Sequence, residues 1–542
     1  MNFRTLKALA VAAPLLVVAG ACTDPTVAPK STVTGANIWN DQNAYQQYMA
    51  KLYGGLILTG QQGPAGSADI ANIDEGFSEY LRLYWYMQEV PSDEAVIGWN
   101  DQGLRDLNIQ GWSSSNLMVS AMYNRIYFQI TLANEFLRQT TADLLTQRNV
   151  GPALKATIQQ YRAEARFLRA LSYWHGMDFF GAIPFANENT AISGPAPKQV
   201  ARDSIYRYVV SELTSLKDSL PLVGPNTYGR ATAAAANMLL AEVYLNAAVY
   251  TGTPHYDLAL AAAQAVIGSG NYQLEPNFAL NFSSDNNTSR EIIFSAAEDG
   301  NYTQTWGGMT FLVHAGCGGN MSAASFGMDY CWGGYRIKQQ AHRWFSAGDV
   351  RGAFIYDSAK AYAAGDTTTG VNHGISNVKD SVNDIGNFQS GAAAPKFTNK
   401  TSAGVTPAQT TMISTDFPIF RLAEAYLIYA EAAVRSNTNL ATALTDFNLV
   451  RARAHGGSAA FNITAGQLTT DTILAERGRE LLFEARRRTD LIRYGLFTGG
   501  TYNWAWKNNV PGGAAIGTKY ALYPIPSNEL AVNPNVTQNT GY

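Results

Sequence analysis

Charged residues and cysteines are both scarce in this chain of 542 residues. Only 15% of the residues are Asp, Glu, Lys or Arg, and the formal net charge is −3. Without a basic excess, the composition excludes a protein that binds nucleic acid mainly through its phosphates. The chain has three cysteines, so one thiol is left over if the other two form a disulfide.

Short catalytic motifs are also missing. None of the six histidines is followed by glutamate, as a zinc-protease motif requires. The chain has no G-x-S-x-G nucleophile elbow and no Gly-Lys pair for a phosphate-binding loop. We therefore expect no enzyme activity, no metal and no cofactor. A glycosidase stays open as an alternative, because its two carboxylates can lie far apart in the sequence.

Long apolar runs are absent except at the N-terminus. Arg4 and Lys7 precede an apolar run at residues 8–19, and Gly20, Ala21 and Cys22 follow it. This pattern is typical of a signal peptide, here residues 1–21, and the run is shorter than the about 20 residues that span a membrane. A cysteine directly after small residues is the acceptor for a lipid, so we predict a lipid anchor on Cys22. The alternative is an ordinary secreted protein in which Cys22 is incidental.

Lipidation of Cys22 leaves Cys317 and Cys331. In an oxidising compartment these two are expected to form a disulfide that closes a loop rich in glycine and aromatic residues. Two free buried thiols are the alternative.

Helices of one recurring kind are predicted along the chain. Residues 230–250 and 421–435 each place Ala, Leu and Tyr on one helical face, and they carry the related pentads AEVYL and AEAYL. A second amphipathic helix follows each of them, Tyr256–Ile267 and Leu440–Ala454. Small residues on these faces let antiparallel helices approach closely, as in tetratricopeptide-type repeats. The predicted fold is mainly α: a tetratricopeptide-like scaffold with a long insertion.

The insertion, residues 275–415, has a different composition. Gly, Asn, Ser and Thr replace the alanine-rich pattern, and short apolar runs such as residues 291–295 stand between turns. We expect loops and a few short strands here. Insertions of this kind commonly carry function.

The charged segment at residues 472–494 is predicted to be one helix. Glu476, Glu480 and Glu484 recur every four residues, a spacing that would also suit a pair of catalytic carboxylates. An ion-paired face explains them better, because Glu484 lies four residues before Arg488 and Arg486 lies four before Asp490.

Three C-terminal segments resemble the closing signature of the SusD/RagB family. They are residues 416–435 (DFPIFRLAEAYLIYAEAAVR), 472–497 (TILAERGRELLFEARRRTDLIRYGLF) and 522–542 (LYPIPSNELAVNPNVTQNTGY). Patches at residues 88–101, 123–137, 164–185, 229–245 and 342–351 resemble the family in the same order. Thr540 stands where the family usually has proline.

The resemblance implies a SusD-like fold with these parts: a signal peptide at 1–21, an N-terminal region at 22–225, central repeat helices at 226–274 and a C-terminal region at 275–542. It also implies a lipoprotein of the cell outer membrane, exposed at the surface, that binds an oligosaccharide and delivers it to a SusC-like, TonB-dependent receptor. A secreted glycan-processing hydrolase and a repeat scaffold that binds only proteins are the alternatives.

Aromatic residues supply the candidate ligand contacts, because flat rings suit the apolar faces of sugars. Loop positions beside glycine are explained less well by core packing than positions at helical spacing. The predicted ligand-binding residues are Trp85, Trp99, Tyr302, Trp306, Trp332 and Tyr335.

Overall fold

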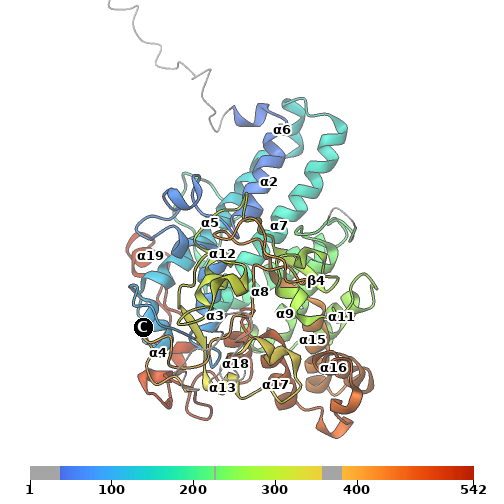
Figure 1. The fold of residues 1–542 in the computed structure, drawn as a ribbon. Helices are drawn as coiled ribbons and strands as arrows, with labels where there is room; N and C mark the ends of the chain where they lie inside the picture. The colour runs from blue at the N-terminus through green and yellow to red at the C-terminus, as the bar shows by residue number, and fades with distance from the viewer. Residues whose placement is uncertain (1–36, 225–226, 357–380) are drawn as a thin grey trace, which may run out of the picture. The chain divides into compact units, whose positions relative to one another are not determined.

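The computed structural model describes residues 37–224, 227–356 and 381–542 (Figure 1). The predicted signal peptide and the predicted lipidation site Cys22 lie outside the described residues. The chain divides into a short N-terminal unit that ends at Gln46 and a main unit, Gln47–Tyr542. Helix α2 begins in the N-terminal unit, and the other elements below belong to the main unit.

Helices make up most of the regular structure. Their bounds are α2 (Ala44–Gly54), α3 (Tyr80–Glu89), α4 (Leu104–Ile109), α5 (Leu117–Gln139), α6 (Ala142–Gln147), α7 (Pro152–Phe180), α8 (Arg202–Leu216), α9 (Ala233–Leu245), α10 (Ala247–Thr251), α11 (Tyr256–Ile267), α12 (Gly308–Ala315), α13 (Gln339–His342), α15 (Leu422–Ser436), α16 (Leu440–Ala454), α17 (Thr470–Leu481), α18 (Arg487–Arg493) and α19 (Ser527–Val532). In the part of the chain that the structure describes, no helix is long and apolar enough to cross a membrane.

The scaffold is a series of packed helices. Helix α7 packs against α5 and α8, α9 against α8 and α11, and α15 against α11 and α16 (Figure 1). Alanines such as Ala263 on α11 and Ala430 on α15 are fully buried, so small side chains let neighbouring axes approach. The predicted helix pairs are confirmed, and Tyr256–Ile267 and Leu440–Ala454 have the predicted bounds.

The helix predicted at residues 230–250 is divided into two. Thr232 caps the N-terminus of α9 by accepting a hydrogen bond from the amide of Ala235 (3.2 Å). Asn246 ends the helix, and its side-chain amide donates to the carbonyl oxygen of Glu242 (3.0 Å). Helix α10 then begins at Ala247.

Within residues 37–224, 227–356 and 381–542, the strands form three antiparallel pairs. They are β1 (Ala95–Ile97) with β5 (Tyr335–Ile337), β2 (Ile183–Pro184) with β3 (Gln199–Val200), and β4 (Ile292–Ala296) with β6 (Phe417–Arg421). The short strand predicted near residues 291–295 is confirmed as β4. The insertion also contains helix α12, which the glycine-rich composition did not predict. All eight residues of α12 are buried, so tertiary packing overrides the local preference.

The single helix predicted at residues 472–494 is wrong. The chain breaks between α17 and α18, where Phe483 (φ 63°) and Ala485 (φ 59°) take left-handed backbone conformations. Buried groups from the other end of the chain hold this break. Glu94 accepts a hydrogen bond from the amide of Phe483 (2.9 Å), and the Trp85 indole donates to the carbonyl oxygen of Phe483 (3.1 Å).

The ion pairs predicted within this segment are also wrong. Glu484 pairs with Arg421 (2.6 Å) and Lys396 (2.5 Å), while Asp490 pairs with Arg477 (2.8 Å) and Arg493 (2.7 Å). Glu484 pairs with residues outside the segment, whereas Asp490 pairs inside it, with Arg477 and Arg493 and not with Arg486. Ion pairing itself was predicted, but the partners differ from the predicted i+4 neighbours.

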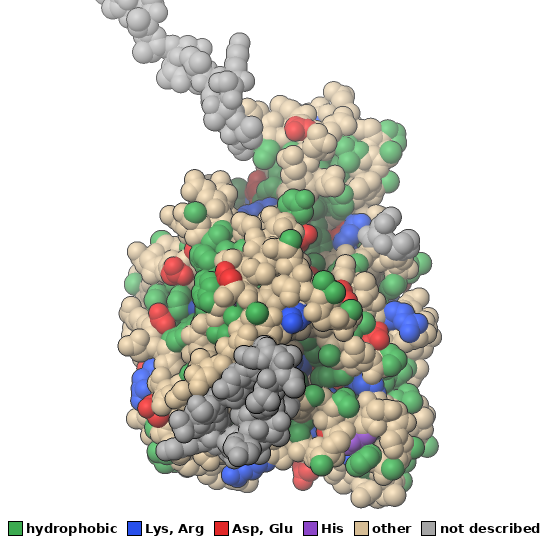
Figure 2. Space-filling model, viewed as in Figure 1, with side chains coloured by type: hydrophobic (Ala, Val, Ile, Leu, Met, Phe, Trp, Pro, Cys, Tyr) green, Lys and Arg blue, Asp and Glu red, His purple; other side chains and the backbone are tan. Residues whose placement is uncertain are grey.

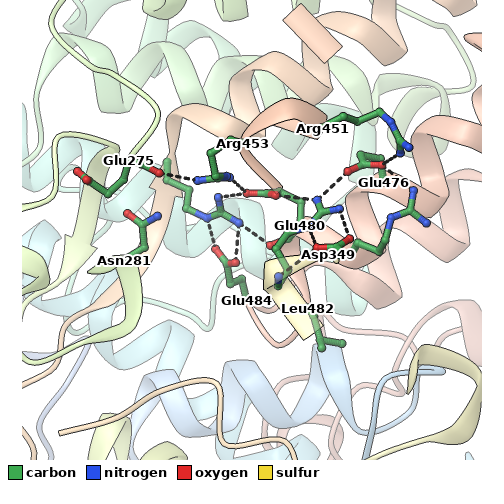
Figure 3. A network of polar contacts seen from close by, with 12 residues as sticks. Glu275, Asn281, Asp349, Arg451, Arg453, Glu476, Glu480, Leu482 and Glu484 are labelled. Atoms are coloured by element: carbon green, nitrogen blue, oxygen red, sulfur yellow. Dashed lines mark hydrogen bonds and ion pairs between the residues drawn. The ribbon is translucent and has the colours of Figure 1, made fainter. Parts of the chain in front are cut away.

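A buried ion network joins the insertion to the scaffold (Figure 3). We define it as Glu291, Asp349, Arg351, Lys396, Arg421, Arg453, Glu476, Glu480 and Glu484. Burial opposes ionisation of Glu476, but Arg351, Arg479 and Arg451 outweigh it and lower the pKa of Glu476 to about 2. These carboxylates are fully engaged by cations, so the network is structural and not a pair of catalytic acids.

Candidate functional site

Strand pairing brings Trp99 and Trp332 together across more than 230 positions of sequence. In the β1–β5 pair, Ile97 lies opposite Tyr335, and the amide of Gly98 donates to the carbonyl oxygen of Gly334 (2.9 Å). The two tryptophans extend just beyond this ladder, with ring centroids 6.2 Å apart. Gly334 permits the approach, because a Cβ there would lie 2.7 Å from the Trp99 ring.

The segment that carries Trp332 is fixed to the C-terminal end of α12. The amide of Trp332 donates to the carbonyl oxygen of His314 (2.9 Å), and the amide of Gly333 donates to that of Cys317 (2.7 Å). A disulfide joins Cys317 to Cys331. The Trp332 ring stacks on buried His314, with centroids 4.8 Å apart. Trp332 therefore has a rigid base.

The backbone amide and the backbone carbonyl oxygen of Trp306 are both hydrogen-bonded to side chains. Its amide donates to the Glu75 carboxylate (3.0 Å), and its carbonyl oxygen accepts from the Arg82 guanidinium (3.0 Å). The Trp306 ring lies 6.1 Å from the Trp332 ring.

Together these rings form a group that we call the aromatic cluster: Trp99, Trp306, Tyr330 and Trp332. Tyr330 is 44% exposed and lies 6.3 Å from Trp332, and the three tryptophans are half-buried. The cluster thus offers several connected ring faces at the surface of the insertion. Burial lowers the pKa of His314 beneath the cluster, which favours the uncharged imidazole there.

Two predicted ligand contacts are wrong. Trp85 and Tyr335 are both 0% exposed. Their rings pack against each other with centroids 4.9 Å apart, and the Tyr335 hydroxyl donates to the carbonyl oxygen of Leu312 (2.8 Å). Both belong to the core beneath the cluster, because all three residues of β5 and all ten residues of α3 are buried.

The other predicted residues are accessible. Trp99, Trp306 and Trp332 are brought together in the cluster. Tyr302 is 84% exposed on the turn after Asp299, four residues before Trp306. It remains a predicted contact at the edge of the site.

Sequence reasoning missed Arg82, His314 and Glu75. The Arg82 guanidinium lies 5.6 Å from the Trp99 ring centroid and 3.8 Å from that of Phe77. These residues lie on other elements, and no local motif distinguishes them. Exposed Asn100 and Asp101 follow Trp99 directly and add polar groups beside the rings.

Two cavities lie away from the aromatic cluster. One of about 150 Å³ is lined by Tyr228, Thr232 and Ser295, and one of about 290 Å³ lies between Phe278 and Phe354. The chemistry of the aromatic cluster differs from theirs. Open ring faces flanked by amide and carboxylate groups suit a flat ligand that is apolar on its faces and carries hydroxyls at its edge.

Comparison with known proteins identifies the family. The SusD family model matches residues 335–542. The starch-binding protein SusD of Bacteroides thetaiotaomicron is 32% identical, over 100% of both chains. The chain belongs to the SusD family. A second relative, a SusD-like protein of Bacteroides ovatus, is 24% identical over 91% of this chain and 83% of its own length.

Solved structures show the same SusD-superfamily fold. Surface glycan-binding protein A of Bacteroides thetaiotaomicron in complex with laminarihexaose has a TM-score of 0.68 at 20% identity, covering 91% of this chain and 98% of that chain. Surface glycan-binding protein A from Bacteroides fluxus has a TM-score of 0.68 at 23% identity, covering 94% and 100%. The tetratricopeptide-like helical fold predicted from the sequence is confirmed.

Proposed function

We propose that this SusD-family protein binds an oligosaccharide at the aromatic cluster. The observation that carries the proposal is the group of connected, partly exposed rings of Trp99, Trp306 and Trp332 on a rigid base. Stacking on preformed rings costs little ordering entropy when a ligand binds. The names of the relatives, a starch-binding protein and a protein in complex with laminarihexaose, support a glucose-based glycan as the first ligand to try.

The second part of the proposal is delivery. Resemblance to the family implies that the protein is anchored by a lipid on Cys22 in the outer membrane and passes its ligand to a SusC-like, TonB-dependent receptor. Several acyl chains on one residue would hold the protein firmly, at about 0.8 kcal/mol per buried CH₂. Mass spectrometry of the mature N-terminus tests the anchor, and co-purification with a β-barrel receptor in mild detergent tests the partnership.

Binding is tested directly with starch and laminarihexaose. The mature protein should be retarded in native gels that contain starch, and calorimetry should give an affinity for at least one of the two glycans. The variant Trp306→Ala/Trp332→Ala should lose this binding. Phe461→Ala is the matched control, because Phe461 is 42% exposed and stacks on His455 away from the insertion.

Two results would count against the proposal. One is the absence of binding to either glycan. The other is equal binding by the double variant and the Phe461→Ala control. Release of shorter products during the incubation would instead favour the hydrolase alternative.

A further inference from the structure

Three buried carboxylates lie against the segment that carries Trp306. The amide of Trp306 donates to Glu75 (3.0 Å), the amide of Gly308 donates to Glu79 (2.8 Å), and the amide of Met309 donates to Glu298 (2.9 Å). We call Glu75, Glu79 and Glu298 the carboxylate clamp. Glu75 and Glu79 come from one short segment and Glu298 precedes Trp306 by eight residues, and all three converge on one short stretch of backbone.

The fit around this stretch is close and depends on glycine. A Cβ at Gly307 would lie 2.4 Å from the Cβ of Glu79, and one at Gly308 would lie 2.3 Å from Oε1 of Glu298. Gly308 also has φ +47°. The backbone can therefore approach the carboxylates only because residues 307 and 308 have no side chains.

Two of the amides that the clamp binds, those of Gly308 and Met309, open helix α12. The first amides of a helix have no partner within the helix, so carboxyl oxygens can accept hydrogen bonds from them. The same helix ends at the residues that support Trp332. The clamp therefore positions both the Trp306 backbone and the helix beneath the cluster.

Few opposite charges compensate the clamp. Arg125 is near Glu79 but pairs with Asp69 (3.3 Å), and Arg82 is near Glu75 but donates to Trp306 and Tyr86. The other charged groups nearby are acidic. Asp74 faces Glu75, while Asp416 and Glu79 both face Glu298.

We propose that Glu75, Glu79 and Glu298 are positioning residues that hold Trp306 in the aromatic cluster and make its placement depend on pH. The proposal rests on the proposed function, because it concerns the platform for the same ligand. Burial without a nearby positive charge disfavours the ionised form of a carboxyl group. Opening the clamp to water would let these carboxyl groups ionise.

The direction of the pH effect follows from linkage. Burial raises the pKa of Glu79 to about 7, against an ordinary value of 4.5, and burial also raises the pKa values of Glu75 and Glu298. The closed clamp therefore holds protons that a hydrated clamp releases. Raising the pH favours opening, and lowering it favours the closed platform.

Hydrogen exchange measures this opening without any ligand. If opening fully hydrates Glu79, the opening constant for a peptide that spans residues 303–312 should rise about tenfold from pH 6 to pH 8, after correction for intrinsic exchange. Glu79→Gln cannot ionise, so its protection should lose the pH response. The level of protection should lie below that of the wild type at pH 6, because the glutamine NH₂ cannot accept the hydrogen bond that Glu79 accepts from the amide of Leu81 (2.7 Å). Gly307→Ala should be poorly protected at both pH values.

Glu529→Gln is the control variant, since Glu529 lies on α19 and its carboxylate accepts a hydrogen bond from nearby Asn533 (2.9 Å). It should respond to pH as the wild type does. Protection of the wild type that does not change with pH, or an unchanged response in Glu79→Gln, would overturn the proposal.

Starch binding, measured at the same two pH values, separates this inference from the proposed function. Affinity of the wild type should fall by up to tenfold from pH 6 to pH 8, and that of Glu79→Gln should stay constant. A pH-dependent exchange rate in a protein that binds neither starch nor laminarihexaose would support the clamp and contradict the proposed function. Starch binding with pH-independent exchange would contradict the clamp alone.

Discussion

In the buried ion network, Arg421 contacts the carboxylates of Glu291, Glu480 and Glu484, and each of these four side chains is at most 3% exposed. In the aromatic cluster, Tyr330 and Trp332 reach the surface and contact each other through ring faces and edges. The first region is rich in charge and carries family-like segments, whereas the second is rich in glycine. The comparison teaches that the most distinctive segments of this chain mainly build the scaffold. Of the candidate site, only Trp99 lies in a family-like segment, and Trp306, Tyr330 and Trp332 lie in a segment without a motif.

The distribution of charged side chains on the surface also differs from that in the buried ion network. Figure 2 shows Lys, Arg, Asp and Glu scattered over the visible face without a large patch of one sign. Charge is instead concentrated inside the protein, where removing one partner leaves others buried and unpaired. One ring of the aromatic cluster can be removed without leaving a buried charge unpaired.

The largest effect is expected for Arg421→Ala. This change leaves three buried carboxylates without their shared cation, so the free energy of unfolding should fall by about 4–5 kcal/mol. Chemical denaturation measures it. Arg207→Ala is the control, because its pair with Asp203 is solvent-exposed and should contribute little to stability. Equal losses for the two variants would contradict a structural role for the network.

Tyr335→Ala tests the boundary between core and cluster. Tyr335 is fully buried against Trp85 and Phe483, so truncation should cost about 3–4 kcal/mol of stability. Below the unfolding transition, glycan affinity should stay within about threefold of wild type, since the ring touches no ligand. A large loss of glycan affinity without a loss of stability would indicate that Tyr335 contacts the ligand.

Trp332→Ala should give the opposite pattern. Loss of a central stacking ring is expected to weaken glycan binding by about 1–3 kcal/mol, or roughly 5- to 150-fold. The thermal midpoint should change less than in Tyr335→Ala, because Trp332 is half-buried and its backbone is held by α12 and the disulfide. Calorimetric titration and thermal melting of both variants give the comparison. A midpoint that falls as far as that of Tyr335→Ala would make Trp332 structural.

Sequence patterns predicted the scaffold well because helix faces are local. The amphipathic pattern predicted the bounds of α11 and α16. The same reasoning failed at Phe483, where a buried carboxylate from residue 94 holds a left-handed turn. It also missed α12, whose helical state depends on burial and on the carboxylate clamp.

The candidate site was predicted only in part for the same reason. Glycine neighbours correctly suggested that Trp306 and Trp332 are surface rings, but they gave the same signal for Tyr335. Only the pairing of β1 with β5 decides which of these side chains face the core. Arg82 could not be predicted, since its position under Trp99 is a tertiary contact.

The smallest effect is expected for Tyr302→Ala. Tyr302 is 84% exposed, so its loss should leave the free energy of unfolding within about 0.5 kcal/mol of the wild type. Its turn is four residues from Trp306, so the ring would extend the cluster at its edge. Peripheral contacts contribute less than central ones, and affinity should fall by no more than about 1 kcal/mol, or fivefold. If the Tyr302→Ala change lowers the affinity for longer glycans more than that for shorter ones in calorimetric titrations, Tyr302 contacts an outlying sugar. An equal affinity at every glycan length would remove Tyr302 from the site and confine binding to Trp99, Trp306, Tyr330 and Trp332.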